Sequence, residues 1–92
     1  MSATVSDESL PGVDFATFVL SLSHSALVHM GEAPSPETGK VDREMTLARQ
    51  TIDVIAMLEE KTRGNLTGDE ERMLGQILYD LRMRYVEQSK TK

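Results

Sequence analysis

The sequence predicts an all-α protein of three helices, and three observations carry this prediction. Apolar residues recur at spacings of three, four and seven along three segments of the chain. Residue types that begin and end helices stand at the ends of those segments. Only Gly64, Asn65 and Leu66 separate the second segment from the third. We therefore expect these two helices to form an antiparallel hairpin.

The first helix is expected over residues 15–30. Asp14 stands where an N-cap belongs, and Gly31 is the expected stop. One side of this helix carries a broad apolar arc of Phe15, Phe18, Val19, Leu22, Ala26, Leu27 and Met30. The connection after it, residues 32–40, contains two prolines and a glycine. It is long enough for the first helix either to pack on the hairpin or to be exchanged with a second copy.

The second helix is expected over residues 43–63, with Asp42 as its cap and Gly64 as its end. Lys61 and Arg63 place positive charge near its last carbonyl groups. Its core side is expected to be Leu47, Ala48, Thr51, Ile52, Val54, Ile55 and Leu58.

The third helix is expected over residues 68–88, because Thr67 and Glu70 have the spacing of a capping box. Its core side is expected to be Met73, Leu74, Ile77, Leu78, Leu81 and Tyr85. The three helices then form a single domain over residues 14–88. Residues 1–13 and 89–92 are expected to be disordered tails.

Composition excludes several classes of function. The chain has 92 residues, a net charge of −5 and no run of basic residues, which argues against nucleic-acid binding. It has no cysteine, so disulfides and thiolate metal sites are excluded, and no cofactor or metal is expected. The amino-terminal residues are acidic where a signal peptide would be basic, and we expect a cytoplasmic protein.

The two histidines are candidates for catalytic or metal-binding groups. His24 and His29 are five residues apart, which separates them by about 140° on a helix and does not suit a metal pair. Ser25 beside His24 is no evidence of a catalytic triad, because a triad is defined by spatial neighbours. The acidic pairs at 59–60 and 70–71 are explained by helix solvation and the helix dipole. A non-enzymatic protein is the expectation.

Small polar side chains line the other side of the first helix. Thr17, Ser21 and Ser25 recur every fourth residue, and His24 shares their side. Residues 15–31 contain no Asp, Glu, Lys or Arg, which is unusual for a solvated face. This face is either a docking surface or a solvated face, and its lack of charge favours a contact. At about 24 Å the helix is too short to span a bilayer.

A second apolar row lies on the third helix, on the side away from its core residues. It consists of Tyr79, Met83 and Val86. A chain of this size has a small core and gains stability from a partner subunit. We therefore expect a homo-oligomer, with a dimer favoured, in which this row contacts a second copy or another protein.

The expected function is thus a homo-oligomeric helical protein interaction module. Two alternatives stay open. One is a small enzyme or ligand-binding subunit that uses His24 or His29 at a subunit boundary. The other is peripheral membrane association through the uncharged first helix, although a basic flank for anionic lipid is missing.

Three stretches of the chain, "LARQTID", "LEEKTRGNLT" and "LYDLRMRYVE", resemble a family of short bacterial helical proteins catalogued only as a domain of unknown function. The likeness covers about residues 14–87. It implies a small helical bacterial cytoplasmic protein, and it assigns no functional residue. Gly68 and Gly75 stand where helix formers would be expected, and at interior positions each weakens the third helix by about 1 kcal/mol.

Overall fold

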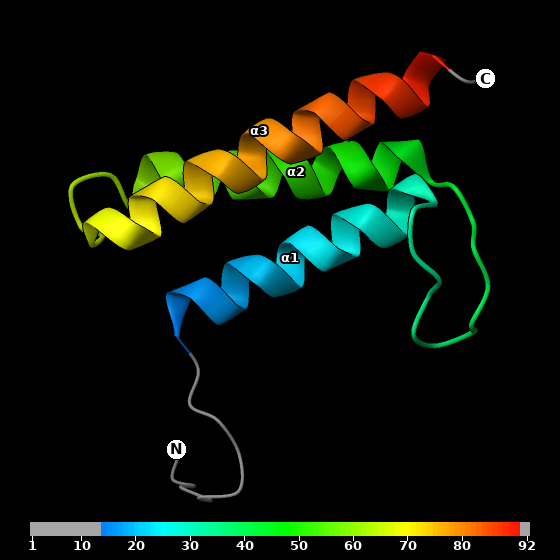
Figure 1. Ribbon diagram of the computed structural model, residues 1–92, viewed down its shortest axis with the longest axis horizontal. Helices are drawn as coiled ribbons and strands as arrows, with labels where there is room; N and C mark the ends of the chain where they lie inside the picture. Colours follow the sequence, from blue (N-terminus) through cyan, green and yellow to red (C-terminus); the bar gives the residue numbers. More distant parts are fainter. Residues whose placement is uncertain (1–13, 91–92) are drawn as a thin grey trace, which may run out of the picture.

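The computed structural model describes residues 14–90, and this part of the chain forms three α-helices and no strand (Figure 1). They are α1 (Phe15–Met30), α2 (Met45–Lys61) and α3 (Gly68–Lys90). The all-α prediction is confirmed. The expected tail over residues 1–13 lies outside the described residues.

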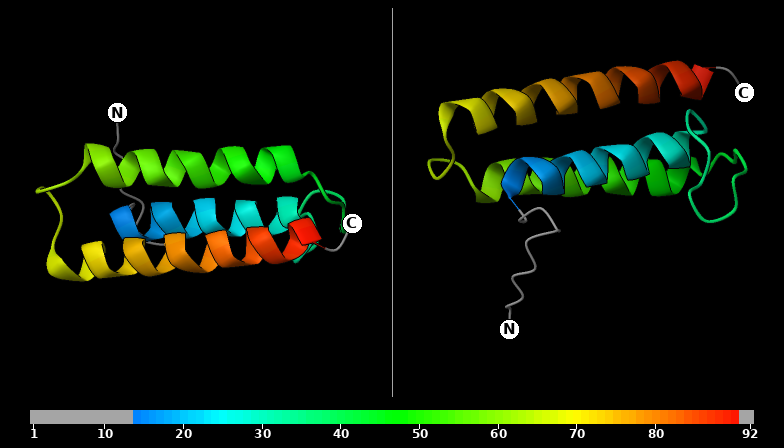
Figure 2. Two further views of the ribbon diagram at one scale, coloured as in Figure 1. Left: turned by 90° about the horizontal axis from the view of Figure 1, so that it is seen from above. Right: turned by 60° about the horizontal axis from the view of Figure 1, so that its bottom comes forward.

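Each helix packs against the other two, so the bundle is triangular in section (Figure 2). Helices α2 and α3 form the expected antiparallel hairpin, and α1 runs in the same direction as α3 (Figure 1). The first helix therefore packs on the hairpin of its own chain. The connection between α1 and α2 loops out beyond one end of the bundle (Figure 1).

Three fully or almost fully buried apolar side chains from each helix form the core. They are Val19, Ala26 and Met30 of α1, Ala48, Ile52 and Ile55 of α2, and Leu74, Leu78 and Leu81 of α3. Each large aliphatic side chain that is withdrawn from water contributes about 1.5–3 kcal/mol. The core is made of few residues and contains no buried polar or charged residue among those described.

Both ends of α1 follow from its sequence. The Asp14 carboxylate accepts a hydrogen bond from the Thr17 N–H at 2.8 Å, as an N-cap does. Gly31 ends the helix in the left-handed region, at φ 82°. A β-carbon added at Gly31 would lie 2.6 Å from Cγ of Arg43. Glycine is thus required here both by the backbone and by the neighbouring side chain.

The start of α2 differs from the prediction. The helix begins at Met45, its N-cap is Glu44, and Asp42 does not cap it. The Glu44 N–H instead donates to the His29 carbonyl oxygen at 2.7 Å. Arg43 donates from Nη2 to the carbonyl oxygen of Gln88 on α3. These two contacts with distant parts of the chain hold residues 43 and 44 outside the helix.

The end of α2 also differs. The helix ends at Lys61, and Thr62 is its C-cap rather than the expected Gly64. The Thr62 hydroxyl donates to the Leu58 carbonyl oxygen at 2.6 Å, and its N–H bonds the same oxygen at 2.9 Å. Gly64 has a positive φ of 84° within the turn that follows. The connection to α3 is therefore residues 62–67, longer than expected but still a hairpin turn.

The start of α3 matches the expected capping box. The Thr67 N–H donates to the Glu70 carboxylate at 2.9 Å, and the Glu70 N–H donates to the Thr67 hydroxyl at 3.1 Å. The helix continues to Lys90, so the expected disordered tail is wrong for residues 89 and 90. Residues 91 and 92 lie outside the described part of the chain.

Two side chains that were expected in the core, Leu47 and Val54, are exposed instead, and so is Phe18 of the apolar arc on α1. Phe18 lies about a quarter turn away from Val19, which is the buried centre of its helix. Leu47 and Val54 lie on the outer side of α2, while Ala48 and Ile55 point inward. In a bundle of three helices, the part of each helix surface that is buried is narrower than the apolar stripe in its sequence.

Candidate interaction surfaces

The outer row of α3, defined as Tyr79, Met83 and Val86, is exposed to solvent. Tyr79 is 69% exposed, Met83 is 49% exposed and Val86 is 50% exposed. The row has this exposure because Leu74, Leu78 and Leu81, on the other side of the helix, fill the core. The structure therefore leaves the row without a covering group from the described part of the same chain.

A shallow groove runs beside the outer row, between α2 and α3. It has a volume of about 180 Å³ and is lined by Arg49, Ile52, Asp53, Arg82, Tyr85 and Val86. Val86 thus belongs both to the groove and to the outer row. Arginine and aspartate side chains surround its apolar part, and an apolar centre with a charged rim is the usual composition of protein interfaces.

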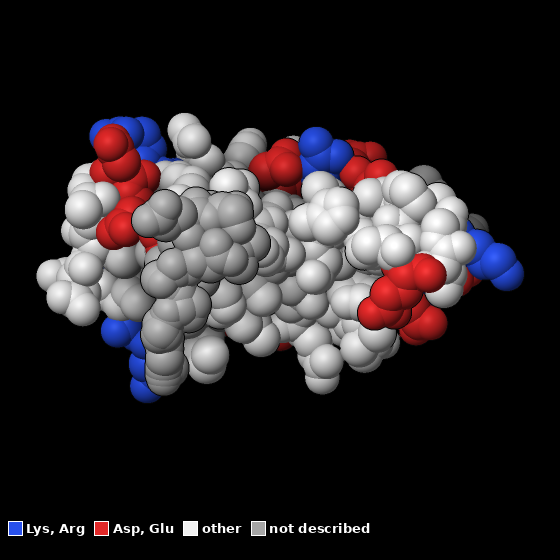
Figure 3. Space-filling view, turned by 90° about the horizontal axis from the view of Figure 1, so that it is seen from below, with Lys and Arg blue, Asp and Glu red and all other residues white. Residues whose placement is uncertain are grey.

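The uncharged face of α1, defined as Thr17, Ser21, His24 and Ser25, is exposed at all four residues. Figure 3 shows the side of the molecule on which α1 lies. In the part of this view that the grey residues do not cover, the charged groups gather at the margins. The structure has these four residues on one side of α1. It places them on the side of α1 away from the core residues Val19 and Met30.

Both histidines line one hollow at the end of α1. Its volume is about 210 Å³, and its lining residues are His24, Ser25, Val28, His29, Ser35, Pro36 and Glu37. Their spacing along the helix places the two histidines on different sides of α1. The connection after α1 forms the opposite wall of the hollow, so that both histidines line it. Within residues 14–90, no cluster of three or more His, Cys, Asp or Glu side chains could hold a metal ion.

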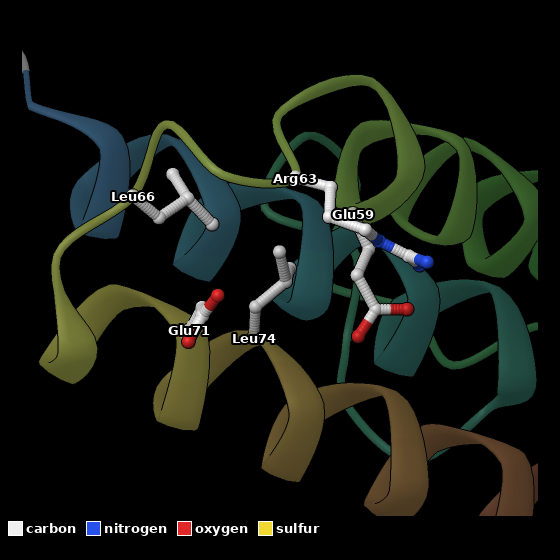
Figure 4. Close-up of a pocket in the computed structure, with 5 residues that line it drawn as sticks. All are labelled: Glu59, Arg63, Leu66, Glu71 and Leu74. Carbon is white, nitrogen blue, oxygen red and sulfur yellow. The ribbon is translucent and has the colours of Figure 1, made fainter.

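A further hollow lies at the turn between α2 and α3 (Figure 4). It has a volume of about 320 Å³ and is lined by Glu59, Arg63, Leu66, Glu71 and Leu74. One residue from each acidic pair of the sequence therefore meets here, which sequence spacing did not reveal because it depends on how the turn folds. Arg63 places a positive charge among the two carboxylates, so the hollow has a mixed charge.

The outer side of α2 carries exposed apolar residues that the sequence pattern had assigned in part to the core. They are Leu47, Val54 and Met57. Their spacing of seven and three places them on one side of the helix. The sequence feature that indicates this exposed surface is the width of the apolar stripe on α2. The stripe is wider than the side of a helix that this bundle can bury.

None of the helices described here, over residues 14–90, is both long enough and apolar enough to cross a bilayer.

The family model for a domain of unknown function, DUF1844, matches residues 12–87 of the chain. The match covers all of α1 and α2 and most of α3. Comparisons with curated proteins and with solved structures find no match.

Proposed function

The chain belongs to the DUF1844 family, and we propose that it is a non-enzymatic helical interaction module that forms homo-oligomers, with a dimer as the basic unit. One observation carries this proposal, the exposure of Tyr79, Met83 and Val86 along a single side of α3. A continuous apolar row that is rimmed by charge is the usual mark of a protein contact.

The size of the core supports the same conclusion. A domain of this length buries a smaller fraction of its surface than larger domains do, so its stability on its own is small. Covering the outer row by a second copy removes further apolar area from water, at roughly 25 cal/mol per Å². Self-association therefore adds stability to a chain that has little stability on its own. As the compartment of the protein we propose the cytoplasm.

The uncharged face of α1 is the second contact surface in this proposal. Its short side chains at Thr17, Ser21 and Ser25 allow another helix to approach closely. Their hydroxyl groups can donate to carbonyl oxygens of that helix. This face lies on a different helix from the outer row, so it is free to bind a second partner after the chain has dimerised.

Methyl spectra of the methionines test the proposal within the unaltered protein. Met83 is in the outer row and half exposed, whereas Met30 is fully buried in the core. On dilution, we expect the Met83 methyl resonance to shift and the Met30 resonance to stay in place. A Met83 resonance that does not change from millimolar to low micromolar concentration contradicts self-association through this row.

A second candidate function is ligand binding at the hollow that His24 and His29 share. The observation that favours it is the meeting of two imidazoles, two serine hydroxyls and the Glu37 carboxylate around one space of about 210 Å³. Such a lining offers donors and acceptors to a small polar ligand.

The histidine variants separate the two functions. Changing both His24 and His29 to Gln leaves the outer row of α3 untouched, so self-association should keep its strength at pH 7. If the protein instead binds a ligand at this hollow, the double variant should lose affinity for small polar ligands. A ligand screen monitored by NMR measures that affinity. If the double variant loses self-association while the helices stay folded, the contact lies at the histidines rather than at the outer row.

A further inference from the structure

The side of α3 that carries the outer row has two unequal halves. Because residues three, four and seven apart share one side of a helix, Gly68 and Gly75 lie in line with Tyr79 and Val86. The first half of this side therefore has two positions without a side chain, and Arg72 and Gln76 lie beside them. The second half carries the three bulky residues of the outer row, which are exposed.

The single chain does not require glycine at either position. A β-carbon added at Gly68 or at Gly75 meets no atom within 4 Å. Gly75 lies inside α3, where glycine costs about 1 kcal/mol relative to alanine. Glycine in a helix also lets another backbone or a large side chain approach closely. The open space above these residues is therefore available to a group from outside the chain.

We infer that a second copy of the chain occupies this side of α3, with the two α3 helices antiparallel and the bulky half of each lying on the glycine half of the other. This inference rests on the proposed self-association and specifies its geometry. Tyr79 of one copy lies opposite Gly75 of the other, and Val86 lies opposite Gly68. Both pairs have the same midpoint, Ile77, so one register and one two-fold axis satisfy them together.

The charges of α3 fit the same register. Its first turn carries Asp69, Glu70 and Glu71. In the antiparallel pair these acids lie opposite residues 83–85 of the second copy, a stretch that includes Arg84 and directly follows Arg82. A parallel pair would instead bring the two acidic turns together, and like charges repel. Arg84 already binds Asp80 and Glu32 of its own chain. The antiparallel orientation is therefore favoured mainly because it keeps the two acidic turns apart.

One like-charge pair in this register is Arg72 opposite Arg82. Arg72 already binds Asp69 within its own helix, with 2.8 Å between Nη1 and Oδ1. Arg82 lines the groove that also contains Asp53 of α2. Each arginine therefore has an acidic side chain of its own chain nearby, which offsets the repulsion between them.

Disulfide cross-linking tests the register directly, because the chain has no cysteine of its own. Gly68→Cys and Val86→Cys are prepared as separate proteins, mixed and oxidised mildly. We expect the mixture to form a disulfide between the two variants. Neither variant alone should form one efficiently, because at 1.5 Å per residue Val86 lies about 27 Å along the helix from its copy in the partner. A disulfide needs α-carbons within about 7 Å.

Each outcome has a distinct meaning. A Val86→Cys protein that links to itself indicates parallel helices and overturns the inference. A chain that dimerises but gives no mixed link overturns the antiparallel register and leaves self-association standing. A chain that stays monomeric at all concentrations overturns both the inference and the proposed function. A dominant mixed link supports the inference.

Gly75→Leu provides a second test that does not depend on oxidation. The added side chain enters the open space above α3, so the helical circular dichroism and the folded state should persist. The same side chain fills the place of the partner's Tyr79, and we expect dimer affinity to fall by at least tenfold. Gly75→Ala is the matched control, and we expect it to lower the dimer affinity less than Gly75→Leu does. Equal dimer affinity in Gly75→Leu and the unaltered chain contradicts the pairing.

Discussion

Arg84 of α3 binds Glu32, the residue that follows the glycine stop of α1, with 2.6 Å between Nη1 and Oε1. The Gln88 side chain donates to the other oxygen of Glu32 at 3.0 Å. Arg84 also binds Asp80 at 2.8 Å. The hydrogen bond to Asp80 and then that to Glu32 raise the pKa of Arg84, which stays charged. This contact ties the end of α1 to the last turns of α3.

Glu32→Gln should lower the free energy of unfolding by about 1 kcal/mol. The Arg84 side chain is 45% exposed and that of Glu32 is 21% exposed, so solvent reaches the ion pair and weakens it. Denaturant unfolding measures the change. Glu37→Gln, in the exposed connection, is the control and should change the stability by less than about 0.5 kcal/mol. A loss above about 3 kcal/mol for Glu32→Gln would mean that the pair behaves as a buried one, contrary to its exposure.

Two glycine-to-alanine changes should have opposite signs. Gly31→Ala places a side chain in the left-handed region and against Arg43, so it should destabilise the fold by about 1–2 kcal/mol. Gly75→Ala adds a methyl group in open space within a helix and should stabilise the single chain by up to about 1 kcal/mol. Thermal unfolding at a concentration where the chain is monomeric compares the two. A stabilised Gly31→Ala protein would contradict the geometry at the end of α1.

Thr67→Ala should cost about 1 kcal/mol, because it removes the hydroxyl that accepts from the Glu70 N–H. Thr46→Ala is the matched control, since Thr46 is an exposed threonine in the first turn of α2. It should leave the stability unchanged or raise it slightly, because alanine is the better helix former. Equal losses in the two variants would show that the capping box contributes little to α3.

The N-cap of α1 predicts a dependence on pH. The hydrogen bond from the Thr17 backbone lowers the pKa of Asp14 below 3.8. A group whose pKa is lowered on folding stabilises the fold above its unfolded pKa and loses this contribution as the pH falls through the folded pKa. The stability difference between the unaltered chain and Asp14→Ala should therefore be constant above about pH 5 and shrink below about pH 4. A difference that grows on acidification would reverse the assigned direction.

The parts of the fold that the sequence predicted are set by local chemistry. Asp14 and Gly31 delimit α1, and the reciprocal bonds of Thr67 and Glu70 start α3. Each of these signals acts within three or four residues, so the sequence contains all of it. The side of each helix that holds the core also follows from local spacing, as Leu74, Leu78 and Leu81 illustrate.

The parts that the sequence did not predict depend on contacts between distant residues. Arg43 and Glu44 stay out of α2 because they bind α3 and the end of α1, respectively. The meeting of His24 and His29 around one hollow depends on the path of the connection after α1. Spacing along a helix cannot express such contacts. The outer row of α3 was identifiable in advance, because it is a second stripe on a helix whose first stripe is sufficient for the core.

The direct test of the interface is sedimentation equilibrium of the unaltered chain, Tyr79→Glu and Val41→Glu over a wide range of concentration. Val41 is 57% exposed in the connection before α2, so its substitution adds the same charge at a comparable exposure away from the outer row. We expect the unaltered chain and Val41→Glu to dimerise with similar affinity, and Tyr79→Glu to remain a folded monomer at concentrations where they are dimers. Dimers of equal affinity in all three proteins, or a monomeric unaltered chain at every concentration, would contradict an interface at the outer row of α3.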